Sequence, residues 1–72
     1  MKEVNNFKEA IIYIMSKDET VTKYSLAKTL GMSTASMISN ILTGYTKRPR
    51  KQFVDALYKE FGIKIKGENY ES

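Results

Sequence analysis

The 72-residue sequence predicts a single all-α domain of four or five helices over residues 1–62, followed by a short C-terminal tail over residues 63–72. Several segments repeat apolar residues at spacings of three and four, as on one face of a helix. Three of the four glycines, Gly31, Gly44 and Gly62, directly follow such segments, where a left-handed residue commonly ends a helix. Ser, Thr and Asn precede the segments and are good helix caps.

The first helix is predicted to begin after Asn5 or Asn6, because either residue is a good N-cap, and to end between Lys17 and Glu19. Its apolar residues recur at helical spacing. They are Phe7, Ala10, Ile11, Ile14 and Met15. Because Ile12 and Tyr13 widen the apolar face, the helix is either deeply buried or contacts something on a second side, and we expect the core to cover both residues.

Two short helices are predicted in the middle of the chain. The first covers KYSLAKTL, with Thr22 as its cap and Gly31 at its end. Ser33 or Thr34 is expected to cap the second, which runs to about Thr43. The apolar contacts of the first are expected from Tyr24, Leu26, Ala27 and Leu30.

The fourth predicted helix runs through QFVDALYKEF, with Pro49 in its first turn and Gly62 at its end. The segment IKIK that follows alternates apolar and basic residues, which is typical of a short strand or an extended arm. The apolar stripe of the helix consists of Phe53, Val54, Leu57, Tyr58 and Phe61.

Charge is segregated along the chain, which carries 12 Lys and Arg, 8 Asp and Glu and a net charge of +4. All the acids lie outside residues 20–54, so this window is purely basic. A surface of one sign favours a polyanion as partner, since phosphate contacts release condensed counterions. An ordinary solvated basic face is the alternative. The basic residues of the window are Lys23, Lys28, Lys47, Arg48, Arg50 and Lys51.

Two short helices joined by a tight turn that contains Gly form the helix-turn-helix arrangement. Residues 22–44, TKYSLAKTLGMSTASMISNILTG, resemble the lambda-repressor-like family, which includes Cro, CI and related small phage and bacterial regulators. The resemblance spans about Val21 to Ile63. Its matching features are Leu26-Ala27, Leu30-Gly31 at the turn, Ser33, Ile38-Ser39, Ile41, Gly44, the basic loop and Pro49.

One residue and one spacing depart from the family's pattern. Many members have Gln where this chain has Lys23, so a phosphate contact is retained but amide contacts with base-reading side chains are lost. The spacing from Gly31 to Ile38 is one residue longer than the most frequent one. The spacing from Gly31 to Gly44 fits the Cro-like variant, in which Met37 takes the apolar anchor position. The register of the third helix therefore stays open.

Helical geometry predicts which face of the third helix is exposed. At about 100° per residue, its apolar side chains point on average along Ile38, which is therefore expected to be buried. Asn40 is the one residue on the opposite face able to bind a base in a bidentate manner, so we expect modest sequence discrimination. The candidate base contacts are Ser33, Ser36, Ser39, Asn40 and Thr43, with Thr34 and Ala35 added in the Cro-like register.

Much of the affinity for double-stranded DNA would then come from the phosphates. The cluster YTKRPRK follows the third helix directly, where a clamp on the DNA backbone would lie. The candidate phosphate contacts are Lys23, Lys28, Tyr45, Lys47, Arg48, Arg50 and Lys51.

A second interpretation stays open for the same helix. Small polar residues flanked by Met32, Met37 and Ile38 are also typical of a protein-binding surface. The resemblance implies a role in a lysis–lysogeny switch, through operator DNA or through a phage repressor protein, and small modulators of repression (antirepressors) share this size and motif. We expect a dimer or heteromer, with the first helix or IKIK as its interface. A solvated helix face and an antitoxin are the remaining alternatives.

Enzymatic activity is not expected. The chain has no Cys and no His, so the usual zinc ligands and the commonest general base are missing, and no Gly-rich phosphate loop is present. No metal or cofactor is therefore predicted. The start MKEVNNFKEA does not resemble a signal peptide, and no segment approaches the roughly 18 apolar residues of a membrane span. The expected location is the cytoplasm of a bacterial host.

Overall fold

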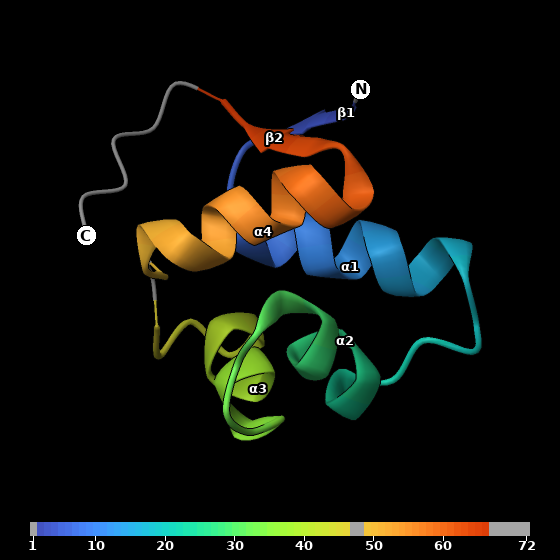
Figure 1. Cartoon of the computed structure of the whole chain (residues 1–72), viewed down its shortest axis with the longest axis vertical. Helices are drawn as coiled ribbons and strands as arrows, with labels where there is room; N and C mark the ends of the chain where they lie inside the picture. Colours follow the sequence, from blue (N-terminus) through green and yellow to red (C-terminus); the bar gives the residue numbers. More distant parts are fainter. Residues whose placement is uncertain (1, 47–48, 67–72) are drawn as a thin grey trace.

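The computed structural model describes residues 2–46 and 49–66, which form four helices and two short strands (Figure 1). The strands lie side by side on one side of the molecule. None of the described helices is long and apolar enough to cross a membrane. The elements are β1 (Lys2–Val4), α1 (Phe7–Lys17), α2 (Lys23–Leu30), α3 (Ser36–Leu42), α4 (Lys51–Phe61) and β2 (Ile63–Ile65).

The predicted bounds of α1 are confirmed. The side-chain oxygen of Asn6 accepts a hydrogen bond from the backbone N–H of Glu9 at 2.9 Å, which satisfies a group that has no partner within the helix. The Glu9 carboxylate in turn accepts a hydrogen bond from the Asn5 N–H at 2.9 Å. The last residue of the helix is Lys17, and Asp18 is its C-cap.

The strands β1 and β2 form a parallel sheet, which corrects the prediction of an all-α domain. Lys2 pairs with Ile63 and Val4 with Ile65. Of the short strand or extended arm predicted in IKIK, the structure has the strand, β2. The sequence does not predict β1, because its three residues include only one buried apolar side chain, Val4. Since parallel strands need a long crossover, all four helices stand between the paired strands along the chain.

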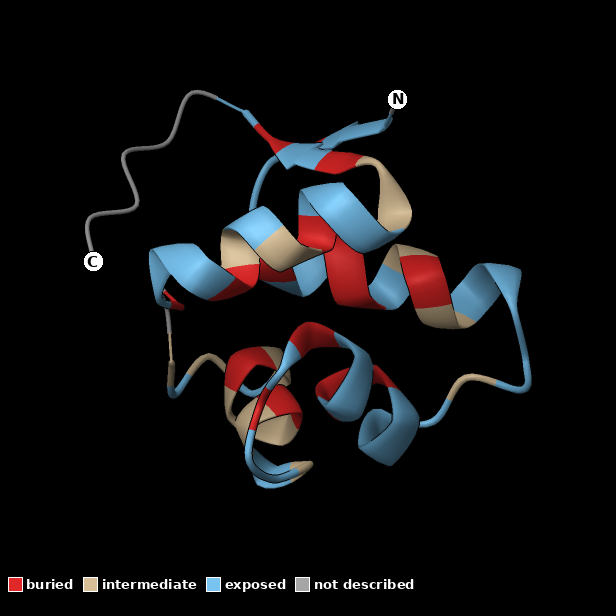
Figure 2. Ribbon diagram, in the orientation of Figure 1, coloured by how far each residue is buried: buried red, intermediate tan, exposed pale blue. Residues whose placement is uncertain are grey.

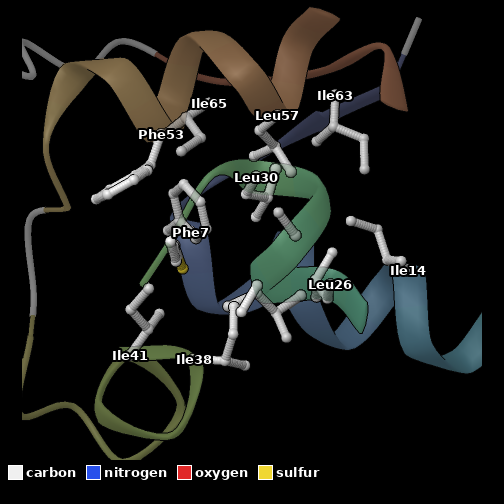
Figure 3. Packing of buried hydrophobic residues seen from close by; sticks show 14 of the residues in the cluster. Phe7, Ile14, Leu26, Leu30, Ile38, Ile41, Phe53, Leu57, Ile63 and Ile65 are labelled. Carbon is white, nitrogen blue, oxygen red and sulfur yellow. The ribbon is translucent and has the colours of Figure 1, made fainter. Parts of the chain in front are cut away.

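The helices α1 and α4 lie between the sheet and the pair α2–α3 (Figure 1). The buried residues of all six elements form one cluster. Their positions along the ribbon are red in Figure 2. Figure 3 shows Ile38 and Ile41 extending from α3 into this cluster. The cluster consists of Val4, Phe7, Ala10, Ile11, Ile14, Leu26, Ala27, Leu30, Met32, Ile38, Ile41, Phe53, Leu57, Ile63 and Ile65.

Three predictions about the faces and ends of α1 and α4 are wrong. Ile12 is 51 % exposed, because it lies about 150° around α1 from the mean direction of the buried side chains and no element covers that side. Tyr58 on α4 is 53 % exposed for the same reason. Pro49 is buried but precedes the N-cap residue of α4, which is Arg50.

Replacement of Ile63 by Ala tests whether β2 belongs to the core. Ile63 is 1 % exposed, so Ile63→Ala should lower the free energy of unfolding by about 2 to 4 kcal/mol. Its neighbour Lys64 is exposed on the same strand. Lys64→Ala should therefore change the free energy of unfolding by less than about 0.5 kcal/mol. Urea denaturation measures both values. Similar values for the two variants would show that β2 is not part of the core.

The carboxylate of Asp18 gives a prediction about pH. It accepts hydrogen bonds from the Thr20 hydroxyl at 2.6 Å and the Thr20 N–H at 2.9 Å, and these bonds lower the pKa of Asp18 below 3.8. Because the folded pKa is lowered, the stability that it confers is present at neutral pH and is lost as the pH falls through the lowered pKa.

An NMR titration of the Asp18 carboxyl carbon should therefore give a pKa below 3.8. Thr20→Val removes the hydroxyl donor and keeps the backbone N–H, so it should move the pKa back toward 3.8. An unchanged pKa in this variant would contradict the assignment of the shift to the Thr20 hydroxyl.

Candidate functional site

A capping box fixes the start of α2. The backbone N–H of Ser25 donates to the Thr22 hydroxyl oxygen at 3.1 Å, and the Thr22 N–H donates to the Ser25 hydroxyl oxygen at 3.0 Å. Thr22 is therefore the N-cap of α2, as predicted. The buried face of α2 consists of Leu26, Ala27 and Leu30, which leaves Lys23, Tyr24, Ser25, Lys28 and Thr29 exposed.

The turn after α2 depends on Gly31, whose φ of 81° lies in the left-handed region that other residues avoid. The N–H of Gly31 donates to the Lys28 carbonyl at 3.2 Å, and that of Met32 donates to the Ala27 carbonyl at 2.8 Å. These bonds satisfy carbonyls at the end of α2. Met32 is buried directly after the turn, so the chain is anchored before α3 begins.

The start of α3 differs from the prediction. Its N-cap is Ala35, with no side-chain hydrogen bond, so neither Ser33 nor Thr34 is the cap. Backbone carbonyls close the first turn instead: Thr34 accepts from Met37 at 3.3 Å and Ala35 from Ile38 at 3.0 Å. Because Ala35 already has right-handed helical φ and ψ angles, the chain turns into the helix without the extended cap residue that a hydroxyl cap requires.

The predicted orientation of α3 is confirmed. Ile38 is fully buried and Ile41 is 4 % exposed, so this helix is anchored through one side. The opposite side presents Ser36 and Thr43, which are exposed, and Ser39 and Asn40, which are half-buried. Ser33 and Thr34 are exposed and Ala35 half-buried at the start of the same surface. These seven residues are the candidate reading face.

Asn40 is the longest polar side chain of the reading face. Its backbone carbonyl accepts the Thr46 N–H at 3.0 Å and the Thr43 hydroxyl at 3.3 Å. Among the described residues, its side-chain amide makes no hydrogen bond. The amide is therefore available to a ligand, and its donor and acceptor match the edge of an adenine base.

Cations stand beside α3 at two places. A pocket at the start of α3 has Lys28 and Tyr24 in its wall, and a second pocket of about 320 Å³ between α3 and the start of α4 has Arg50 in its wall. Lys23 is exposed in the first turn of α2. Lys51 makes an exposed ion pair with Asp55 at 3.2 Å, which offsets part of its charge.

The segment after α3 begins with a turn, which the hydrogen bond from the Thr46 N–H to the Asn40 carbonyl closes. Tyr45 is 83 % exposed there. Lys47 and Arg48, which the sequence also assigns to the site, lie outside the described residues. The structure therefore brings together the reading face, Lys28 and Arg50.

Tyr24, for which the sequence predicts a place in the core, belongs to this exposed surface instead. The side chain is 69 % exposed and lines the same pocket as Lys28 and the residues before α3. A signal existed in the sequence: Tyr24 lies about 110° around α2 from the mean direction of Leu26, Ala27 and Leu30. Comparison of the chain with protein-family models, curated proteins and solved structures gave no match. The chemistry of this surface is therefore the basis for a functional proposal.

Two threonines on α2 test how the site is supported. Thr22→Ala removes the acceptor of the Ser25 N–H, so it should lower the free energy of unfolding by about 1 kcal/mol. Thr29 donates its hydroxyl to the Ser25 carbonyl at 3.0 Å within the helix. Because Ala favours a helix interior, Thr29→Ala should be neutral or stabilising by a few tenths of a kcal/mol. Thermal denaturation compares the two, and equal losses would contradict the role of the cap.

Proposed function

We propose that the chain binds double-stranded DNA through the reading face of α3 and acts as a transcriptional regulator in a bacterial cytoplasm, of the kind that serves a phage lysis–lysogeny switch. The observation that carries this proposal is the placement of Lys28 and Arg50 in the walls of two pockets beside an anchored helix with a small polar face. The resemblance of residues 22–44 to lambda-repressor-like regulators supports it.

Base recognition would depend on close approach. The reading face carries no side chain longer than that of Asn40, so α3 can lie deep in a major groove. Asn40 would pair with adenine through two hydrogen bonds, worth about 1 to 3 kcal/mol of discrimination. Ser36, Ser39 and Thr43 would add single hydrogen bonds that several bases satisfy. This chemistry predicts modest sequence specificity.

Phosphate contacts would supply most of the affinity. Lys28 and Arg50 are exposed cations beside α3, and Lys23 is exposed in the first turn of α2. The hydroxyls of Tyr24 and Tyr45 can donate hydrogen bonds to phosphate oxygens. Each neutralised phosphate releases condensed counterions, so the logarithm of the association constant should fall linearly with the logarithm of the salt concentration.

A repressor protein is the second candidate partner, and one observation favours it. The pocket between α3 and α4 has Met37, Ile41 and Phe53 in its wall beside Asn40 and Arg50, so an apolar side chain of a partner could enter it. This interpretation also expects Met32 and Ile38 to flank an exposed surface. Both side chains are buried, so they do not contribute to one. The chain would then act as an antirepressor without reading DNA.

The deciding experiment is a salt titration of DNA binding by fluorescence anisotropy. The probe is labelled duplex DNA from the regulatory region next to the coding sequence, with an unrelated duplex of equal length as reference, in the presence and absence of the neighbouring repressor. We expect binding by the chain alone that weakens with salt and is moderately tighter for the regulatory duplex. Absence of DNA binding, together with a stable complex with repressor, would replace this proposal by the antirepressor.

Three variants separate the two kinds of DNA contact. Asn40→Ala should weaken binding to the preferred duplex by about 5- to 150-fold and the reference duplex little, because it removes a base contact. Lys28→Ala and Arg50→Ala should weaken both duplexes alike and each lower the salt slope by about one unit. Lys64→Ala is the matched control, since Lys64 is exposed on β2. Equal effects of Lys28→Ala and Lys64→Ala would contradict the proposed site.

A further inference from the structure

Two exposed aromatic rings stand at the two ends of α3. Tyr24 is 69 % exposed and Tyr45 is 83 % exposed, the highest fractions among the large exposed hydrophobic side chains of the described residues. Tyr24 lines a pocket with the residues just before α3, and Tyr45 follows shortly after the end of the helix. The seven residues of α3 that separate the two ends span about 10 Å.

The pocket beside Tyr24 has the chemistry of a site for a base. Its volume is about 160 Å³, and its apolar lining comes from Ala27 and Met32, which are both buried. The Thr34 hydroxyl, also in the lining, makes no hydrogen bond among the described residues. A hydroxyl both donates and accepts, so the edge of any base can bind it. Lys28, one helical turn after Tyr24 on α2, adds a cation to the same pocket.

Tyr45 is presented on an ordered turn. The Thr46 N–H donates to the Asn40 carbonyl at 3.0 Å, which fixes the backbone next to the ring. A ring held in this way has less freedom to lose when a ligand covers it. Thr46 and Arg50 line the pocket between α3 and α4, so a cation stands near this end of α3 as well. An exposed ring and a cation therefore occur together at both ends.

A DNA duplex leaves the faces of these rings without a partner. The bases of a duplex are stacked on one another, so a protein reaches their edges and the phosphates but not their faces. The tyrosine hydroxyls can bind duplex phosphates while the rings stay in solvent. In a single strand the base faces are free, and stacking of a base on an aromatic ring stabilises the complex whatever the base.

We propose that this surface binds single-stranded nucleic acid, with one base stacked on Tyr24, a second on Tyr45, and the phosphates of the strand paired with Lys28 and Arg50. Residues 20–54 contain no Asp or Glu, so no carboxylate of this window repels the strand. A strand that spans both ends of α3 occupies at least about four nucleotides. The inference does not depend on the duplex contact, although the two ligands would share both cations.

Fluorescence anisotropy of an end-labelled oligo(dT) of about 12 nucleotides tests the proposal with the full chain. We expect binding that weakens with salt. Tyr24→Leu and Tyr45→Leu should each weaken it by about 5- to 150-fold, because each removes one stacked base. Tyr58→Leu is the matched control, since Tyr58 is an exposed tyrosine on α4, and it should leave binding unchanged. Absence of binding, or equal effects of Tyr24→Leu and Tyr58→Leu, would overturn the proposal.

Variants with Phe separate the ring from the hydroxyl. Tyr24→Phe and Tyr45→Phe keep the stacking face, so binding of oligo(dT) should stay within about twofold of the unmodified chain. The same variants remove the hydroxyls proposed to contact duplex phosphates, so they should weaken duplex binding. All four side-chain replacements lie at exposed positions, and circular dichroism should show each variant folded. Loss of oligo(dT) binding in a folded Phe variant would refute stacking.

An oligo(rU) of the same length distinguishes RNA from DNA as the source of the strand. Neither the stacked rings nor the phosphate contacts involve the sugar hydroxyl that is present only in RNA, so the two strands should bind within about tenfold of each other. Binding of one strand alone would contradict this mode of recognition.

The single-strand contact and the duplex contact fail separately. A chain that binds oligo(dT) but neither duplex would retain this inference and refute the proposed function. A chain that binds the regulatory duplex but not oligo(dT) would do the reverse. When both bind, unlabelled duplex should displace labelled oligo(dT), because the two ligands need the same Lys28 and Arg50. Simultaneous binding of both would contradict the shared surface.

Discussion

One continuous apolar core, to which all six elements contribute, holds every other feature of this protein in place. A chain of 72 residues without Cys has no disulfide to add to it. Among the described residues, no buried polar or charged side chain interrupts the core. The helix α3 depends on it most, since seven residues without a side-chain cap are too few for a stable isolated helix. Burial of Ile38 and Ile41 both forms α3 and orients it.

Because of the parallel sheet, the strands and the helices of the core form cooperatively. Val4 is buried near one end of the described chain and Ile65 near the other, and they are partners in the sheet. The strands can pair only when the helices between them have brought the ends together. Conversely, Ile63 and Ile65 cover the side of α1 and α4 that faces away from α3. The helices α1 and α4 thus form a middle layer, with the sheet on one side and α2 and α3 on the other (Figure 1). The site on α2 and α3 depends on this layer, and the layer depends on the sheet.

Local signals were sufficient where structure forms locally. Asn6 and Thr22 are caps because their side chains bond to backbone three residues ahead, and periodicity alone places Ile38 inside. Features that depend on distant parts of the chain could not be predicted from the sequence. The pairing of β1 depends on a strand about sixty residues away, and the exposure of Ile12 depends on which side of α1 the other elements cover. At the start of α3 the local signal favoured the wrong residues, because Ser33 and Thr34 are better caps than Ala, whereas the N-cap is Ala35.

The reading chemistry of α3 sets what a regulator built on this fold would need. A reading face with one strong base contact, through Asn40, would discriminate by about 1 to 3 kcal/mol. Phosphate contacts from Lys28 and Arg50 would add affinity but carry no sequence information. Two copies bound to two half-sites, as the sequence leads us to expect, would double the Asn40 contact, and because contributions from separate positions roughly add, the discrimination ratio would be squared. Small polar side chains on α3 would then suffice for a specific regulator, provided that the rigid core holds each copy in one geometry.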